Sequence, residues 1–153
     1  MKIYADNAAT TRLSDTALAA MTPCFQEIYG NPSSLHTPGQ LAAEKLAAAR
    51  EVFARNLHAD PREITFTSGG SEADNQALRS AAALGARRGK RHIISTKFEH
   101  HAVLHTLQAL EREGYEVTLL DIPPDGVVTA EQVRSAIRPD TCLVSVMFAN
   151  NEI

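Results

Sequence analysis

Apolar residues recur at intervals of three and four in two stretches of the first third of the chain, the spacing that places them on one face of a helix. Ser14 is a good N-cap for the first predicted helix, which we expect Pro23 to disturb and which should end near Tyr29. The second stretch, from Gly39 to about Leu57, is filled with alanine and other strong helix formers. The pattern therefore predicts two helices before residue 60.

Beyond Pro61 the pattern changes to strands that alternate with helices. Short β-branched or apolar runs predict four strands, at residues 64–67, 92–96, 115–120 and 142–148. The stretches between them predict three helices, at residues 71–87, 100–114 and 129–137. Because parallel neighbouring strands need a crossover connection, usually a helix, this order predicts an α/β protein. We expect three αβα layers around a mostly parallel sheet.

The composition narrows the range of partners. The 153 residues carry 15 Lys and Arg against 18 Asp and Glu, a formal charge of −3, which argues against nucleic acid as a partner. No apolar stretch approaches the roughly 20 residues of a membrane helix, and no signal-like segment begins the chain, so we expect neither a membrane protein nor a secreted one. Cys24 and Cys142 lack the spacing of a disulfide scaffold or a zinc site, which favours a reducing, cytoplasmic setting.

The segment 67–72, Thr-Ser-Gly-Gly-Ser-Glu, falls between a predicted strand and a predicted helix. The free N–H groups of such a helix start, together with the helix dipole, form an anion site at the carboxyl edge of the sheet. The segment is therefore a candidate for holding a phosphate group. The segment matches neither GxGxxG nor the Walker pattern, so a plain turn is the alternative interpretation.

Histidines gather at the start of the predicted helix 100–114. His100 follows a strand and is expected to face the same cleft as Ser71, with a simple helix-cap or loop role as the alternative. His101 and His105 share one helix face, a spacing found in metal sites, but no third ligand of convincing geometry accompanies them. We therefore predict no metal site.

Asn150 and Asn151 follow the end of the last predicted strand. Their amides can donate to a ligand oxygen, although turn formation is the more ordinary role of such residues. In open α/β sheets, ligands bind beyond the carboxyl ends of the strands. Three loops, which carry Ser71, His100 and the Asn pair, are therefore expected to converge on one edge of the sheet and to form the site there.

Five motifs along the chain together resemble one family. They occur in the same order in the cysteine desulfurases of the nitrogen-fixation and iron–sulfur-cluster branch of the class V aminotransferase-fold enzymes. The motifs are residues 4–11 (YADNAATT), 30–36 (GNPSSLH), 67–75 (TSGGSEADN), 96–100 (TKFEH) and 150–153 (NNEI). Each motif alone is weak, but five in order are specific. The resemblance implies a pyridoxal-phosphate enzyme of fold type I that removes sulfur from L-cysteine. The products are L-alanine and a protein persulfide for iron–sulfur cluster or thio-cofactor synthesis.

The resemblance also implies roles for individual residues. Gly70 and Ser71 would hold the phosphate of pyridoxal 5'-phosphate, and Asn151 would hydrogen-bond the phenolic oxygen of its ring. His100 would be the catalytic residue, stacking on the ring and assisting proton transfer, for which an imidazole that titrates near neutrality is suited. On the substrate side the resemblance points to Ala9, Thr10 and Asn31.

The resemblance further implies how the chain is divided. Residues 1–13 would contribute to the active site or a small domain, and residues 14–153 would form the amino-terminal part of the large cofactor-binding domain. The family's Schiff-base lysine, its carboxylate facing the pyridinium nitrogen, its substrate-binding arginine and its persulfide-forming cysteine lie beyond the last motif. We therefore expect these 153 residues to be a piece of a longer enzyme and to be inactive alone. The pair Gly70-Ser71 departs from the Ala-Thr or Gly-Thr of many relatives but keeps a hydroxyl and the N–H donors.

The expected partners come from the same resemblance: L-cysteine, a second copy of the chain in a homodimer, and a sulfur-acceptor or scaffold protein. Two alternatives stay open. One is a relative that acts on selenocysteine or transfers an amino group. The other is a catalytically inactive phosphate-binding or assembly module.

Overall fold

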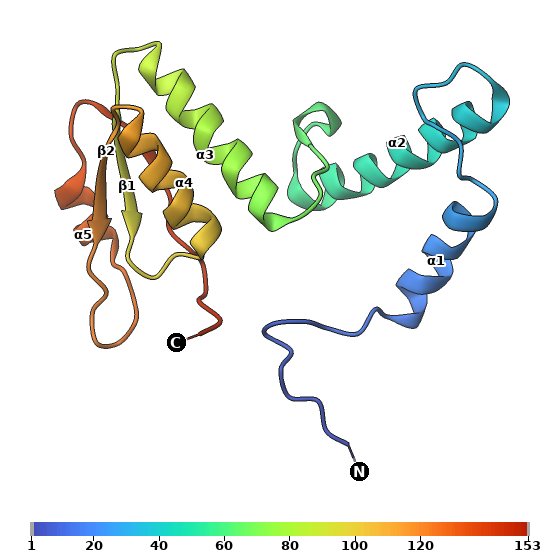
Figure 1. The fold of residues 1–153 in the computed structure, drawn as a ribbon, viewed down its shortest axis with the longest axis horizontal. Coiled ribbons are helices and arrows are strands. Elements are labelled where there is room, and N and C mark those ends of the chain that lie inside the picture. The colour runs from blue at the N-terminus through green and yellow to red at the C-terminus, as the bar shows by residue number, and fades with distance from the viewer. Residues whose placement is uncertain (1, 153) are drawn as a thin grey trace. The chain divides into compact units, whose positions relative to one another are not determined.

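The computed structural model describes residues 2–152, and their contacts divide the chain into two compact units, one ending at Phe66 and the other beginning at Thr67. The first unit holds α1 (Asp15–Gln26), α2 (Thr37–Leu57) and the 3-10 turn η1 (Pro61–Glu63), coloured blue to green in Figure 1. The second unit holds α3 (Gly70–Ala86), β1 (His92–Thr96), α4 (His101–Arg112), β2 (Glu116–Leu120), α5 (Ala130–Ala136) and β3 (Thr141–Val144).

Both predicted helices of the first unit are confirmed, with shifted ends. The Ser14 hydroxyl caps α1 by accepting a hydrogen bond from the Ala17 N–H at 3.1 Å. The helix ends at Gln26, earlier than predicted, where the N–H groups of Glu27 and Ile28 both bond to the Pro23 carbonyl. The second helix begins earlier than predicted because Nδ1 of His36 accepts from the Gly39 N–H at 3.3 Å and serves as its N-cap.

The strand predicted at residues 64–67 is wrong. The sheet of the described residues has three strands, and none of them pairs with this segment. β-branched residues favour a strand only where a neighbouring strand supplies hydrogen bonds. Here the Arg50 guanidinium donates to the Ile64 carbonyl and lies 4.9 Å from the centre of the Phe66 ring. The Phe66 ring meets the Phe53 ring edge to face, with centroids 5.8 Å apart.

The second unit confirms the α/β class, because β1 pairs in parallel with β2 on one side and with β3 on the other. The extent of β1 is as predicted, whereas β3 ends at Val144 instead of residue 148. The last ladder bond runs from the Ser145 N–H to the Ile94 carbonyl at 2.9 Å. The Met147 N–H then bonds to the Glu99 side chain at 2.7 Å, so the chain leaves the sheet there.

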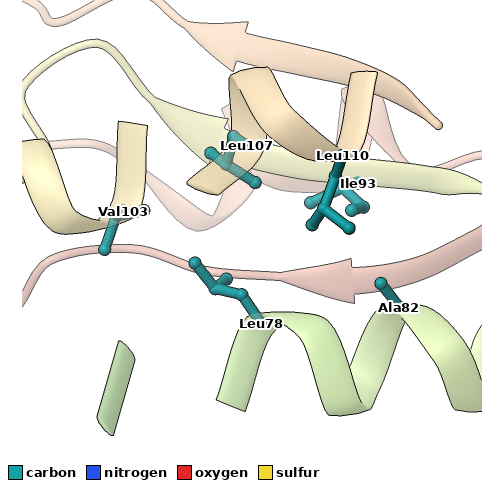
Figure 2. Close-up of a cluster of buried hydrophobic side chains, with 6 residues drawn as sticks. All are labelled: Leu78, Ala82, Ile93, Val103, Leu107 and Leu110. Carbon is teal, nitrogen blue, oxygen red and sulfur yellow. The ribbon is translucent and has the colours of Figure 1, made fainter. Parts of the chain in front are cut away.

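Helices α3 and α4 pack on one face of the sheet, and α5 lies on the other side of the strands in Figure 1. The hydrophobic core between the sheet and helices α3 and α4 consists of Leu78, Ala82, Ile93, Val103, Leu107 and Leu110 (Figure 2). Gly85 allows α3 to approach β3 closely, since a Cβ at this position would lie 2.3 Å from the Cβ of Cys142. Among the helices of the described residues, none is long and apolar enough to span a bilayer.

Candidate functional site

The first turn of α3 lies at the carboxyl edge of the sheet in the second unit. Its N-cap, Gly69, provides no side-chain cap, so the first N–H groups of the helix depend on acceptors outside it. A Cβ added to Gly69 or Gly70 would have open space around it, since it would contact no atom of the described residues apart from the adjoining parts of its own chain. The Glu72 carboxylate bonds backward to the N–H and hydroxyl of Ser68, at 2.6 and 2.7 Å. The start of α3 is therefore accessible to an anion.

Ser71 and His100 line one groove of about 380 Å³ between α3 and α4. The other residues of its walls are Asn75, Arg79, His101, Ala102, His105, Thr106 and Ala109. Two of the three loops that the sequence predicted to converge thus meet at one surface. The groove joins a hydroxyl at a helix start to an imidazole at the next helix start.

His100 is the N-cap of α4, and its Nδ1 accepts a hydrogen bond from the Ala102 N–H at 3.1 Å. A nitrogen that accepts carries no proton, so the proton of the neutral ring is on Nε2. The helix-cap role and a role in the groove, which the sequence left as alternatives, are therefore compatible. One ring nitrogen holds the helix, and the other remains available for a ligand.

The asparagine pair divides its roles differently from the prediction. Nδ2 of Asn150 donates to the Phe98 carbonyl at 2.6 Å, and its Oδ1 accepts from the Glu152 N–H at 2.5 Å. Asn151, the residue to which the resemblance assigns a cofactor contact, is exposed and does not line the groove of Ser71 and His100. Asn150 instead borders a separate cavity of about 760 Å³ with Phe98 and residues 122–128 and 146–149, which are mostly apolar but include Asp125.

Ala9, Thr10 and Asn31 belong to the first unit, and their observed contacts are local. The Ala9 N–H bonds to the Asp6 carbonyl at 3.2 Å, and the Thr10 hydroxyl contacts the hydroxyl of Tyr4. Oδ1 of Asn31 accepts from the Ser33 N–H at 2.9 Å, which is the geometry of an Asx turn. Their assignment to the substrate side therefore stays a prediction.

His101 and His105 stack on each other, with ring centroids 5.4 Å apart and 29° between their planes. Within residues 2–152, no group of three or more His, Cys, Asp or Glu side chains is arranged to hold a metal ion. The two lysines of the second unit, Lys90 and Lys97, have partners away from the groove of Ser71 and His100. Lys97 forms an ion pair with Asp121 after β2, and the Lys90 ammonium lies 3.5 Å from the Thr141 carbonyl.

The sequence did not predict the burial of Glu99, which is 7% exposed although it carries a carboxylate. It accepts from the Thr96 hydroxyl at 3.0 Å and from the Met147 N–H at 2.7 Å. The position of this acidic residue, directly before a candidate catalytic histidine, was the one feature of the sequence that could have indicated a role for Glu99 at the site. Its burial depends on contacts 48 residues apart and has no local pattern.

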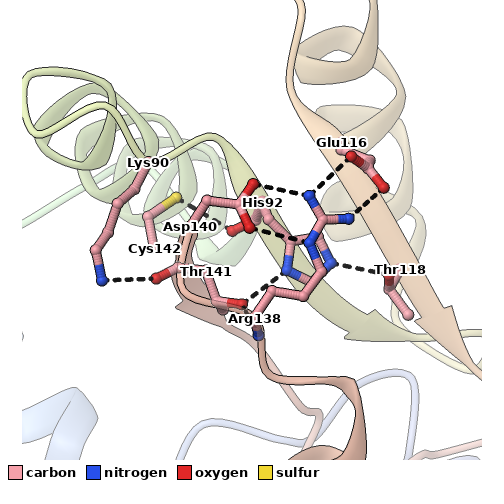
Figure 3. Close-up of polar contacts among 8 residues, drawn as sticks. All are labelled: Lys90, His92, Glu116, Thr118, Arg138, Asp140, Thr141 and Cys142. Atoms are coloured by element: carbon pink, nitrogen blue, oxygen red, sulfur yellow. Dashed lines mark hydrogen bonds and ion pairs between the residues drawn. The ribbon is translucent and has the colours of Figure 1, made fainter.

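The amino edge of the same sheet carries a second polar cluster (Figure 3). The buried His92 ring contacts the hydroxyl of Thr141 through Nδ1 at 2.7 Å and that of Thr118 through Nε2 at 2.9 Å. Burial lowers the pKa of His92, and the Arg138 charge lowers it further. The thiol of Cys142, which donates to the His92 carbonyl at 3.3 Å, has its pKa raised, again mainly by burial.

Arg138 closes this amino-edge cluster by bridging two carboxylates. It makes two hydrogen bonds to Asp140, at 3.0 and 2.7 Å, and a paired contact with Glu116 whose second bond is 2.9 Å. Hydrogen bonds from Arg138 lower the pKa of both carboxyl groups and in turn raise the pKa of the guanidinium. Because the polar atoms here already have partners, this edge offers a ligand fewer free donors than the groove does.

Comparison with known proteins gives the following relatives. Residues 3–153 match the sequence profile of the family described as Aminotransferase class-V. The chain is 49% identical, over 152 residues, to a protein of Clostridium botulinum named cysteine desulfurase IscS; the match covers 99% of this chain and 38% of that protein. The chain therefore spans well under half the length of this curated relative.

Solved structures give a similar result. One described as a NifS-like protein superimposes with a TM-score of 0.93 at 42% identity, covering 100% of this chain and 42% of that one. Another, described as SspA in complex with cysteine, gives a TM-score of 0.86 at 38% identity and covers 95% of this chain and 42% of that one.

Proposed function

Because the chain belongs to the class V aminotransferase family, we propose that it is the amino-terminal part of a pyridoxal-phosphate-dependent cysteine desulfurase. The observation that carries the proposal is the groove that Ser71 and His100 share, with the uncapped start of α3 beside it. The names of the relatives support the substrate. The C. botulinum protein is called a cysteine desulfurase, and the SspA structure contains cysteine.

The start of α3 fits the phosphate of pyridoxal phosphate. A doubly charged phosphate is attracted by the positive end of the helix dipole and by N–H groups without acceptors. The Ser71 hydroxyl adds a further donor, and the glycines before it let a ligand approach the backbone closely. The phosphate would be held by Gly70 and Ser71, as the resemblance implies.

When bound, the cofactor supplies an electron sink that stabilises negative charge left on the substrate carbon. His100 lines the groove, and in the neutral tautomer that the α4 cap requires its Nε2 carries the ring proton and can donate a hydrogen bond to a ligand there. To accept a proton at Nε2 the ring would take the other tautomer, with its proton on Nδ1 and the bond from the Ala102 N–H broken. Its Nδ1 bond to the start of α4 fixes the ring plane, which suits stacking against a flat ligand. Asn151 would donate its amide to the phenolic oxygen of the ring.

The overall reaction breaks the carbon–sulfur bond of L-cysteine. The sulfur passes to a cysteine thiolate of the enzyme as a persulfide, and the carbon takes up a proton to give L-alanine. Neither Cys24 in α1 nor Cys142 in β3 is a good candidate for that thiolate. Both are half-buried, and burial raises the pKa of Cys142, which disfavours the reactive form.

The deciding experiment measures sulfide and alanine from L-cysteine with the full-length enzyme, pyridoxal phosphate and a thiol reductant. We expect both products in equal amounts. A sulfur-containing keto acid in place of alanine and sulfide, or a clear preference for selenocysteine, would instead favour an amino-transferring or selenocysteine-cleaving relative. Phosphate binding without turnover of any of these substrates would favour the inactive assembly module.

The 153 residues by themselves provide a second test. Covalent capture of the cofactor needs a lysine amine placed at the site and partly neutral at working pH. We expect borohydride reduction of the chain with cofactor to label no single lysine and expect no sulfide release. Specific labelling of one lysine together with turnover would show that these residues form a complete enzyme.

We further propose a homodimer, transfer of the persulfide sulfur to an acceptor or scaffold protein for iron–sulfur cluster synthesis, and a cytoplasmic location. The domain assignment, with residues 1–13 serving the active site and residues 14–153 belonging to the large domain, is part of the same proposal. The two free cysteines support a reducing compartment. Light scattering of the full-length enzyme would measure the oligomeric state.

A further inference from the structure

Two side chains bridge the loop after β1 to the segment after β3. The Glu99 carboxylate accepts from the Met147 N–H at 2.7 Å, and the Asn150 side chain donates to the Phe98 carbonyl at 2.6 Å. The first bridge runs from loop side chain to segment backbone, and the second runs the opposite way. Two bridges at different points prevent both sliding and pivoting of one segment against the other.

The Glu99 bridge is unusual because its carboxylate is buried. The side chain is 7% exposed, and the same oxygen, Oε1, also accepts from the Thr96 hydroxyl at 3.0 Å. A buried carboxylate loses its hydration and is retained only where donors replace the lost water. The donors come from the last residue of β1 and from the segment after β3, so Glu99 fixes itself to both.

The two segments joined in this way carry the predicted site residues. His100 follows Glu99 directly and is the N-cap of α4, and Asn151 follows Asn150 directly. The backbone of His100 is therefore held by Glu99 on one side, while its ring is held by the Ala102 N–H on the other. A side chain that stacks on a flat ligand needs its ring to be held this firmly.

We infer that Glu99 is a positioning residue which, together with Asn150, holds His100 and Asn151 in register for the cofactor ring. The inference rests on the proposed function, because the positions matter only if that ring is bound. It assigns to Glu99 no contact with substrate or cofactor. What it requires is an oxygen acceptor at this point, and a negative charge is not needed.

The variants follow from that requirement. Glu99→Ala removes both hydrogen bonds, whereas Glu99→Gln keeps an oxygen that can accept from the Thr96 hydroxyl and the Met147 N–H. Asn150→Ala removes the second bridge. Glu111→Ala, at an exposed position of α4, is the matched control for the loss of a carboxylate.

The experiment uses the full-length holoenzyme and three measurements: hydrogen exchange at the Met147 amide, the visible circular dichroism of the bound cofactor, and the steady-state constants for L-cysteine. For Glu99→Ala we expect at least tenfold faster exchange, a changed dichroism band and about tenfold lower kcat, with KM within twofold. Glu99→Gln and Glu111→Ala should match the wild type. A purely structural role would lower the yield of folded enzyme without changing kcat per folded molecule.

Several outcomes would overturn the inference: wild-type exchange and dichroism in Glu99→Ala, or an effect of Glu99→Gln as large as that of Glu99→Ala. If Glu99→Ala does not fold, Asn150→Ala decides, and a wild-type dichroism band and kcat in that variant count against the inference. A wild-type enzyme that binds cofactor but releases no sulfide refutes the proposed function, whereas the exchange and dichroism measurements still judge the role of Glu99.

Discussion

The amino edge and the carboxyl edge of the sheet carry similar polar side chains in different states. At the amino edge, His92 has a hydroxyl partner on each ring nitrogen, and Arg138 bridges two carboxylates. At the carboxyl edge, His100 uses one ring nitrogen for the α4 cap, and the start of α3 has no side-chain cap. One histidine is therefore committed on both nitrogens, whereas the other keeps a nitrogen for a ligand.

This difference separates structural from functional polar groups better than residue type does. A buried polar group whose partners are all within the protein stabilises one arrangement and has little left to offer a ligand. Donors at a helix start without partners are costly unless something else binds them. The exception at the carboxyl edge is Glu99, which is buried and bonded like the amino-edge groups and has a positioning role by our inference.

The largest contrast is expected from the histidines of α4. His100→Ala in the full-length enzyme should lower the rate of sulfide release by about 100-fold or more, the usual range for a lost acid–base group. Its effect on stability should be about 1 kcal/mol, because only a helix cap is lost. Steady-state rates and thermal unfolding of the same preparations measure the two effects.

His101→Ala and His105→Ala are the controls for that prediction, since these residues border the same groove without capping the helix. Both variants should retain most of the activity. Equal losses in all three variants, or loss of wild-type activity on adding a chelator, would favour a metal site and contradict the assignment of His100.

The next largest effect concerns the phosphate. Ser71→Ala should weaken pyridoxal phosphate binding by about 10- to 100-fold, because a hydrogen bond to a charged group contributes roughly 1.5–3 kcal/mol. Binding should persist through the backbone N–H groups of α3. Titration of the apo enzyme with cofactor measures the affinity. Ser68→Ala is the neighbouring control, since that hydroxyl already donates to Glu72, and an unchanged affinity in Ser71→Ala would remove Ser71 from the site.

Local patterns were sufficient to predict most of the second unit. Residues 92–96 form a strand as predicted, and Ser71 and His100 meet as expected. Only His100 follows a strand of the sheet, however, and Ser71 reaches the groove as part of the first turn of α3. The early end of β3 was not predictable, since it depends on the Glu99 bridge to Met147. Nor was the buried state of Glu99 itself, which depends on the same distant contact.

The first unit shows where local patterns are insufficient. The helical spacing of residues 39–57 was read correctly because alanine-rich amphipathic sequence is decisive by itself. The segment 64–67 has strand-like composition but no paired strand among the described residues, so its high β-propensity does not produce a strand. The helix cap of His36 was missed because histidine is an uncommon N-cap, and only the Nδ1 bond to the Gly39 N–H reveals it.

The amino edge can be tested by pH. The folded-state pKa of His92 lies below its ordinary value of 6.5, so the unfolded chain binds a proton more readily than the folded one. The contribution of His92 to stability is therefore complete above pH 6.5 and is lost as the pH falls from that value through the lower pKa of the folded state. Asp140 and Glu116, whose pKa values are lowered by Arg138, lose their contributions only at more acidic pH, around and below 4.

Thermal unfolding of the protein between pH 7.5 and 5.5 measures this effect. We expect the midpoint to fall over that interval, and His92→Gln, which has no titrating group at this position, should flatten the decline even if the protein is less stable throughout. An identical pH dependence in both proteins would show that His92 accepts a proton in place, and the amino edge would then be less fixed than its contacts indicate.

The smallest effect is expected at two adjacent buried positions of β1. Ser95 and Thr96 are both fully buried, but the Thr96 hydroxyl donates to Glu99, whereas the Ser95 hydroxyl has no hydrogen-bond partner among residues 2–152. A buried hydroxyl without a partner loses its hydration and gains no hydrogen bond in exchange. Ser95→Ala should therefore leave the free energy of unfolding unchanged or raise it by up to about 1 kcal/mol. Thr96→Val, nearly equal in shape, should lower it by about 1–3 kcal/mol because the Glu99 carboxylate loses a donor. Denaturant unfolding of the two variants gives the comparison directly. If Ser95→Ala is as destabilising as Thr96→Val, the Ser95 hydroxyl has a hydrogen-bond partner in the folded protein. The buried polar side chains of β1 would then all be hydrogen-bonded, from the amino end of the strand to its carboxyl end.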